Sequence, residues 1–222
     1  LRQGLQVRVL TRDPSRARSV VGEKVELAAG DVGDAPSVQD AMRGVDSVVS
    51  AVTGFGPGGS GPRLVDRQGN LNLIRAAEAA GVGHFVLLSM QGAAPDHPLE
   101  LLRMKHFAEE VLRSSRLDWT ILRPTVFMEL WTSILGDPIV KTGKTTVFGR
   151  GDNPINFISA RDLACFTGLA LGDLRLRGQT IDIGGPESLT VNKVVQAVER
   201  ASGCKATVRH VPGPVRRLSA QL

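Results

Sequence analysis

A regular alternation of short apolar runs with amphipathic segments restricts the fold of this chain more than any other feature. Runs with the length and composition of strands occupy 5–12, 24–31, 46–54, 84–90, 118–124, 179–185 and 206–211. Helical patterns lie between them at 13–21, 34–44, 66–81, about 99–114 and 189–203, with a short strand and a helix over 155–171. Strands separated by helices predict repeated βαβ units, and therefore an α/β, doubly wound parallel sheet of the Rossmann type.

Helix boundary signals support this division of the chain. Asp13, Asp34, Ser159 and Thr190 stand where N-caps are expected, and Gly81 stands where a helix should end. In an open sheet of this type, ligands bind beyond the carboxyl ends of the strands. The residues that follow each predicted strand are therefore the candidates for a functional site.

Composition excludes several classes of protein. The net charge of +5 is mild and the basic residues are scattered, so we expect no nucleic-acid partner. No apolar run is long enough to predict a membrane span. Cys165 and Cys204 are far apart and no Cys or His pair has ligand spacing, so we expect two reduced thiols, no metal, and a cytoplasmic protein.

Two arginines follow the first apolar run. Arg12 ends the predicted strand, and Arg16 lies one turn into the next helix. In a dinucleotide fold, an arginine at this position accommodates the 2′-phosphate of NADP, whereas an acid favours the free hydroxyl of NAD. A helix N-terminus adds attraction for an anion. The two residues predict NADP as cofactor; the alternative is that Arg12 is a solvated loop residue beside Asp13.

Further candidates for cofactor binding follow the next two strands: Asp31, Val32, Ala51, Val52, Thr53 and Gly54. The carboxylate of Asp31 could reach the adenine amino group. Thr53 and Gly54 lie where the backbone must approach a ribose or pyrophosphate. The alternatives are an aspartate in the first turn of a helix and a flexible glycine-rich loop over 54–62.

One lysine lies within the apolar face of a predicted helix. That face comprises Leu101, Met104, Ala108, Val111 and Leu112. At roughly 100° per residue, Lys105 projects into the same arc. It is either a snorkelling stem paired with Glu109 one turn later, or a residue that faces bound cofactor between the strands that end at Ser89 and Pro124.

Taken together, these segments resemble the NmrA-like branch of the atypical short-chain dehydrogenases/reductases over nearly the whole chain. The most specific piece is a lysine, seventeen intervening residues and Arg-Pro-x-x-Phe, here Lys105, Arg123, Pro124 and Phe127. The resemblance implies one NAD(P)-binding Rossmann-like domain over 1–222, with a small substrate or partner region over about 126–222.

The resemblance also implies roles for individual residues. Lys105 would hold the ribose hydroxyls or donate a proton, and Ser89 would hydrogen-bond the substrate carbonyl. Pro124, Thr125 and Phe127 would lie against the nicotinamide. Each also has an ordinary structural alternative: Ser89 as a residue that only satisfies a strand end, Pro124 as one that only ends a strand, and Phe127 as part of the core.

The sequence departs from the family pattern in two places. The family begins with a strand and a G-x-x-G-x-x-G phosphate loop, whereas this sequence opens with LRQG, similar to the end of the helix behind that loop. We therefore expect about 20 residues to be missing, with the central strand among them. The chain also contains no tyrosine, and Leu101 occupies the position of the tyrosine in the usual Tyr-x-x-x-Lys pair.

Three functions compete on this basis. The first is an NADP-dependent oxidoreductase that reduces a quinone or carbonyl-type small molecule. The second is a non-catalytic NADP-binding redox sensor or assembly factor acting on a protein partner, which the absent tyrosine favours. The third, an enzyme similar to sugar-nucleotide epimerases, ranks last because it requires the same Tyr-Lys pair. The apolar stretch 126–135 fits a substrate wall, a partner surface or a plain core helix.

Overall fold

The structure, a computed structural model, describes residues 4–55 and 59–212. The chain divides into two compact units. The first comprises Leu1–Ile121 and Ala170–Thr180, and the second comprises Leu122–Leu169 and Ile181–Leu222. Three residues of the predicted glycine-rich loop, 56–58, lie outside the described residues.

The first unit follows the predicted alternation closely. Its elements in chain order are β1 (Arg8–Thr11), α1 (Pro14–Val21), β2 (Glu26–Ala29), α2 (Ala35–Ala41), β3 (Ser47–Ser50), η1 (Arg63–Gly69), α3 (Asn70–Ala80), β4 (His84–Leu88), α4 (Glu100–Arg113), β5 (Trp119–Pro124), η2 (Leu174–Leu176) and β9 (Gln179–Ile183). Strands β5 and β9 begin in this unit and continue into the second.

The predicted helix boundaries are confirmed by their hydrogen bonds. Asp13 accepts from the backbone N–H of Arg16 at 2.9 Å, and Asp34 accepts from that of Ser37 at 3.1 Å. Gly81 ends α3 at a φ of 69°, a conformation that favours glycine. The helix predicted from residue 66 differs at its start, because residues Arg63–Gly69 form the π-helix η1 before the α-helical turns begin.

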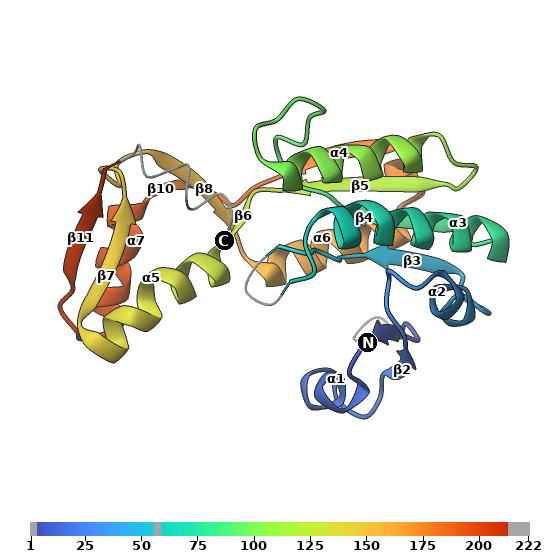
Figure 1. The fold of residues 1–222 in the computed structure, drawn as a ribbon, viewed down its shortest axis with the longest axis horizontal. Coiled ribbons are helices and arrows are strands. Elements are labelled where there is room, and N and C mark those ends of the chain that lie inside the picture. Colours follow the sequence, from blue (N-terminus) through green and yellow to red (C-terminus); the bar gives the residue numbers. More distant parts are fainter. Residues whose placement is uncertain (1–3, 56–58, 213–222) are drawn as a thin grey trace. The chain divides into compact units, whose positions relative to one another are not determined.

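The strands of the first unit form two sheets (Figure 1). Strands β1 and β2 pair in parallel, with Arg8 opposite Glu26 and Thr11 opposite Ala29. The other sheet has the order β3-β4-β5-β9, and β3 and β4 are parallel. Within the described residues no strand pairs with both β1 and β3.

A hydrophobic core lies between the larger sheet and the helices α2, α3 and α4. It includes Val38 of α2, Ile74 of α3, Phe85 of β4, Leu112 of α4 and Ile121 of β5. Figure 1 shows α3 and α4 side by side along the strands. Because the core fixes these helices against the sheet, the residues that directly follow β3 and β4 and the first half of α4 have defined positions.

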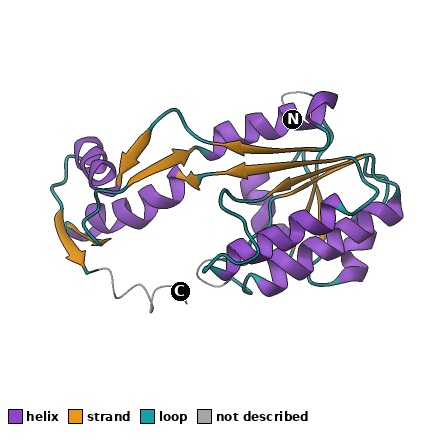
Figure 2. Ribbon diagram, turned by 90° about the horizontal axis from the view of Figure 1, so that it is seen from above, coloured by secondary structure: helices purple, strands orange, loops and turns teal. Residues whose placement is uncertain are grey.

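The second unit has its own elements and core. The elements are β6 (Val126–Phe127), α5 (Met128–Thr142), β7 (Lys144–Phe148), β8 (Pro154–Ile158), α6 (Ala160–Gly172), β10 (Ser188–Thr190), α7 (Val191–Ser202) and β11 (Thr207–Val211), with the last turn of α6 belonging to the first unit. The predicted caps Ser159 and Thr190 accept from Asp162 and Lys193. Strands form the sheets β10-β8-β6 and β11-β7 (Figure 2), and Leu135, Ile139, Phe157 and Val195 lie at the centre.

Two further observations bear on the composition argument. No helix in the described ranges is long and apolar enough to cross a membrane. Cys165 and Cys204 are both free thiols, as predicted.

Candidate cofactor site

A cavity of about 270 Å³ lies at the carboxyl ends of β1, β2 and β3. Its lining consists of Leu10, Thr11, Arg12, Gly30, Asp31, Val32, Val52, Thr53, Gly59, Ser60 and Val65. The structure thus brings together Arg12, Asp31, Val32, Val52 and Thr53, which the sequence had proposed as cofactor contacts from three different strand ends.

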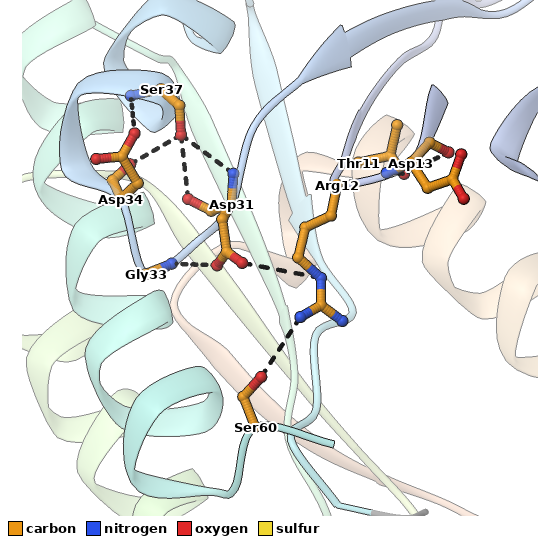
Figure 3. Close-up of polar contacts among 8 residues, drawn as sticks. All are labelled: Thr11, Arg12, Asp13, Asp31, Gly33, Asp34, Ser37 and Ser60. Carbon is orange, nitrogen blue, oxygen red and sulfur yellow. Dashed lines mark hydrogen bonds and ion pairs between the residues drawn. The ribbon is translucent and has the colours of Figure 1, made fainter. Parts of the chain in front are cut away.

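Arg12 lines this cavity, and its guanidinium is held there by two long contacts (Figure 3). Its Nη1 donates to the Ser60 hydroxyl at 3.4 Å, and its Nε lies 3.8 Å from Oδ2 of Asp31. The side chain is 65% exposed and that of Asp31 is 44% exposed. Long contacts in water hold a guanidinium loosely, so Arg12 can reorient toward an anion at little cost.

Asp31 is more firmly placed than Arg12. Its Oδ1 accepts from the backbone N–H of Gly33 at 2.8 Å, and its own N–H donates to the Ser37 hydroxyl at 3.1 Å (Figure 3). Arg16, the second predicted arginine, is exposed on α1 and does not line the cavity. Ala51 is exposed directly after β3 and is likewise not part of the lining.

Gly54 follows Thr53 of the cavity lining, and its backbone lies close to that of Gly61. Its carbonyl accepts from the N–H of Gly61 at 3.2 Å. A Cβ added at Gly54 would lie 2.2 Å from the carbonyl oxygen of Gly61, which no side chain can accommodate without a backbone shift. The N–H of Gly54 donates to Oδ2 of Asp66 at 2.8 Å. The close approach of Gly54 to Gly61 therefore requires a glycine, and the buried carboxylate of Asp66 holds its N–H.

Lys105 is buried, and its ammonium group is surrounded by acceptors. Nζ donates to the carbonyl oxygens of Val52 at 2.9 Å and Leu88 at 3.2 Å, which follow β3 and end β4. It also lies 3.0 Å from Oδ1 of Asp66 in η1. The side chains of Lys105 and Asp66 are 7% and 0% exposed. The lysine therefore does not reach the surface as a snorkelling side chain would, and it forms an ion pair with an acid that the sequence analysis did not consider.

Ser89 directly follows β4, and its hydroxyl already donates a hydrogen bond within the protein. Its hydroxyl donates to Oε1 of Glu109, a fully buried residue of α4. Arg113 lies 3.0 Å from Oε2 of the same carboxylate. Because the serine proton points to Glu109, the remaining polar capacity of the hydroxyl is as an acceptor.

The three residues predicted to lie against the nicotinamide belong to the second unit. Thr125 donates its N–H to the carbonyl of Ile183 at 2.9 Å and its hydroxyl to Oδ1 of Asn156 at 3.2 Å. Pro124 is buried at the end of β5, and Phe127 is opposite Ile158 in the β6–β8 pair. Their role toward a cofactor stays a prediction.

Asp66 and Ser60 are the site residues that sequence reasoning missed. Asp66 contacts Lys105 and Gly54 only because η1 packs on α4, a tertiary contact with no local pattern. Ser60 was included in the predicted loop but had no feature to distinguish it from its neighbours. The segment 66–80 carries several other polar and charged residues, so nothing in its sequence singled out Asp66.

Comparison with known proteins gives a consistent result. A family model described as NAD(P)H-binding matches residues 1–166. The photosystem II assembly factor Ycf39 of Synechocystis is 29% identical over 97% of this chain and 66% of its own length. The NAD(P)H azoreductase of Xenophilus azovorans is 30% identical over 90% of this chain and 66% of its own length.

Solved structures agree on the fold. The NADPH-dependent quinone oxidoreductase QOR2 of Escherichia coli superimposes with a TM-score of 0.77 and 20% identity, covering 98% of this chain and 75% of that one. The chain spans about two thirds of the length of the curated relatives above. The family match and the shared Rossmann-like fold lead to one conclusion: the chain belongs to the NAD(P)H-binding, NmrA-like branch of the atypical short-chain dehydrogenases/reductases.

Proposed function

We propose that this protein binds NADP(H) in preference to NAD(H) and uses it to reduce a quinone or carbonyl-type small molecule. The observation that carries the cofactor preference is Arg12. It is an exposed guanidinium at the cavity mouth whose contacts to Ser60 and Asp31 are long. A 2′-phosphate offers it shorter, charge-assisted hydrogen bonds.

The cavity suits one end of a dinucleotide. Its volume of about 270 Å³ is below the roughly 300–1,000 Å³ of pockets that enclose a whole drug-sized ligand. Asp31 supplies an acceptor and Arg12 a cation, which are the groups that an adenosine 2′-phosphate requires. These two side chains at the cavity therefore fit the adenosine end of NADP.

Lys105 suits the other end of the cofactor. Its ammonium lies where β3 and β4 end, held by the carbonyls of Val52 and Leu88. NADPH supplies the hydride when bound, so the protein need only bind, orient and polarise. Since the chain has no tyrosine, Lys105 or solvent would supply the proton that the product needs.

Titration of NADPH and NADH against the full protein tests the cofactor preference. We expect tighter binding of NADPH, and a loss of about ten- to hundredfold in its affinity on Arg12→Ala, the size of a lost hydrogen bond to a charged group. Arg200→Ala, an exposed arginine on α7, is the control and should change neither affinity. Equal affinities for the two cofactors would refute the preference.

NADPH oxidation against a panel of quinones and carbonyl compounds tests the reaction. A role for Lys105 should be examined in the double variant Lys105→Met/Asp66→Asn, because removing the lysine alone leaves a buried carboxylate without its counter-ion. Turnover in the wild type that the double variant loses supports a reductase.

A second function is favoured by one specific observation. The sequence lacks the tyrosine that serves as acid in most short-chain reductases. Ycf39, a photosystem II assembly factor by name, is among the similar proteins. The alternative is thus a non-catalytic NADP-binding sensor or assembly factor. Tight NADPH binding without oxidation by any member of the panel would favour it.

A further inference from the structure

We propose that Asp66 is a positioning residue for Lys105: it neutralises the buried ammonium without accepting a hydrogen bond from it, and so keeps one N–H of Lys105 for a ligand hydroxyl. This inference rests on the proposed function, in which Lys105 holds the nicotinamide ribose. It concerns a residue that neither the sequence pattern nor the family resemblance had brought forward.

The geometry around the ammonium separates two kinds of acceptor. The carbonyls of Val52 and Leu88 accept hydrogen bonds at 2.9 and 3.2 Å. Oδ1 of Asp66 is just as close, at 3.0 Å, yet it is a buried oxygen with no hydrogen-bond partner among the described residues. An ammonium group has three protons. Two are directed at carbonyls, and among the described residues the third has no aligned acceptor.

The negative charge of Asp66 is needed because the ammonium of Lys105 is buried. A lysine that is 7% exposed has lost nearly all of its water, and a buried charge must be paired to be tolerated. Carbonyl oxygens supply hydrogen bonds but no net charge. Asp66 supplies the negative charge while leaving the direction of the third proton open.

Asp66 is itself held from several sides. Its Oδ2 accepts from the N–H of Gly54 at 2.8 Å, and its backbone carbonyl accepts from the side-chain amide of Asn70 at 2.8 Å. The amide oxygen of Asn70 in turn accepts from the hydroxyl of Ser50 at 2.6 Å. The bond from Gly54 thus restrains the carboxylate, and the bond from Asn70 restrains the backbone that carries it.

The packing of η1 against α4 adds to this restraint. Arg63 donates to Glu100 at 2.6 Å, and the guanidinium of Arg67 lies 4.4 Å from the ring centre of Phe107. Asp66 and Lys105 meet between these two contacts. The π-helical turn that carries Asp66 is a rare conformation that recurs at functional sites.

The variant Asp66→Asn isolates the proposed role. Its amide oxygen can still accept from the N–H of Gly54, so this hydrogen bond is kept while the charge beside Lys105 is lost. We expect NADPH affinity to fall by at least about tenfold. Binding of adenosine 2′,5′-bisphosphate, which lacks the nicotinamide ribose, should change by less than about twofold. The exposed Asp40→Asn on α2 is the matched control and should alter neither.

A double-mutant comparison provides the second readout. If Asp66 acts only through Lys105, then Asp66→Asn adds nothing to the loss already caused by Lys105→Met, and the double variant binds NADPH like Lys105→Met alone. This comparison holds even if the single Asp66 variant does not fold.

The outcomes are distinct. Unchanged NADPH affinity in Asp66→Asn, equal losses for both ligands, or weaker NADPH binding by the double variant than by Lys105→Met would overturn the role of Asp66. A wild-type protein that binds neither NADPH nor NADH would instead overturn the proposed function on which it rests.

Discussion

Two ion pairs within the first unit of this molecule differ in distance and in exposure to solvent. Arg12 and Asp31 lie 3.8 Å apart, are 65% and 44% exposed, and line an open cavity. Lys105 and Asp66 lie 3.0 Å apart and are 7% and 0% exposed. The first pair is solvated and can be rearranged by a ligand. The second pair is desolvated, so separating its two charges leaves each of them without water or a counter-ion.

The difference shows why charge alone does not identify a binding residue. An exposed pair contributes roughly 0–1 kcal/mol to stability, because water screens it and side-chain entropy opposes it. Breaking a buried pair costs about 3–5 kcal/mol, because the remaining charge has no solvent. Exchange of contacts suits a residue that recognises a phosphate, whereas a fixed geometry suits one that orients a ribose.

The largest effect is expected for one half of the buried pair. Lys105→Met should lower the free energy of unfolding by about 3–5 kcal/mol, measured by urea denaturation. Adding Asp66→Asn should restore much of this loss, because no uncompensated charge remains. If the double variant is as unstable as the single one, the two residues are not coupled as described.

A smaller loss of stability is expected at Gly54, which contacts the buried pair and lies beside the cavity of the exposed pair. Its N–H donates to Asp66, and its neighbour Thr53 lines the cavity with Arg12. Gly54→Ala places a Cβ 2.2 Å from a backbone oxygen, so we expect a loss of about 1–3 kcal/mol, seen as a lower Tm. Gly83→Ala is the control, since its nearest neighbour would lie at 3.6 Å.

His84 extends the comparison to a buried group whose charged form is disfavoured. Its Nε2 lies 3.0 Å from the hydroxyl of Thr120, which donates to the carbonyl of Leu176, so Nε2 is the donor. Nδ1 is buried and has no hydrogen-bond partner in the part of the chain that the structure describes. Burial, and then the positive charge of Arg177, lower the pKa of His84 below its ordinary value of 6.5, and Asp118 opposes this shift.

The pH dependence follows from that direction. Below about pH 6.5 the unfolded chain binds a proton at this site that the folded chain does not, so stability should fall as the pH is lowered through 6.5. One such group contributes at most about 1.4 kcal/mol per pH unit. Urea midpoints at pH 7.5, 6.5 and 5.5 measure the slope. It should be reduced in His84→Gln, and an unchanged slope would exclude His84 as its source.

The smallest effect on stability is expected for the exposed pair. Arg12→Ala and Asp31→Asn should each change the free energy of unfolding by less than about 1 kcal/mol. The same Arg12 variant should lose NADPH affinity. A stability loss above about 2 kcal/mol in either variant would show that this pair is structural, and the contrast with Lys105 and Asp66 would disappear.

Sequence reasoning succeeded where the determining chemistry is local. The caps Asp13, Asp34 and Thr190 were predicted because an N-cap bonds within three residues of itself. The assembly of Arg12, Asp31 and Thr53 around one cavity followed from the rule that parallel strands end at one edge.

The remaining features depend on tertiary contacts. A helix was one of three alternatives for the apolar stretch 126–135, yet α5 continues from Met128 to Thr142 with Pro138 inside it, so packing overrode a helix-breaking residue. Strand β10 has three residues and forms by pairing with β8, which no periodicity reveals. The partner of Lys105 was missed for the same reason, since Asp66 lies in a different helix.

The first unit is built from two separate segments of the chain, and this has a consequence for folding during synthesis. That unit consists of Leu1–Ile121 together with Ala170–Thr180, so its last segment is separated from the rest by 122–169. The N–H of Gly178 reaches the carbonyl of Trp119, and Leu176 accepts from Thr120. During synthesis on the ribosome, which proceeds from the N-terminus, these contacts cannot form until residue 178 has left the exit tunnel. A chain arrested before that point would display β5 with an open edge, the kind of surface on which other strands aggregate.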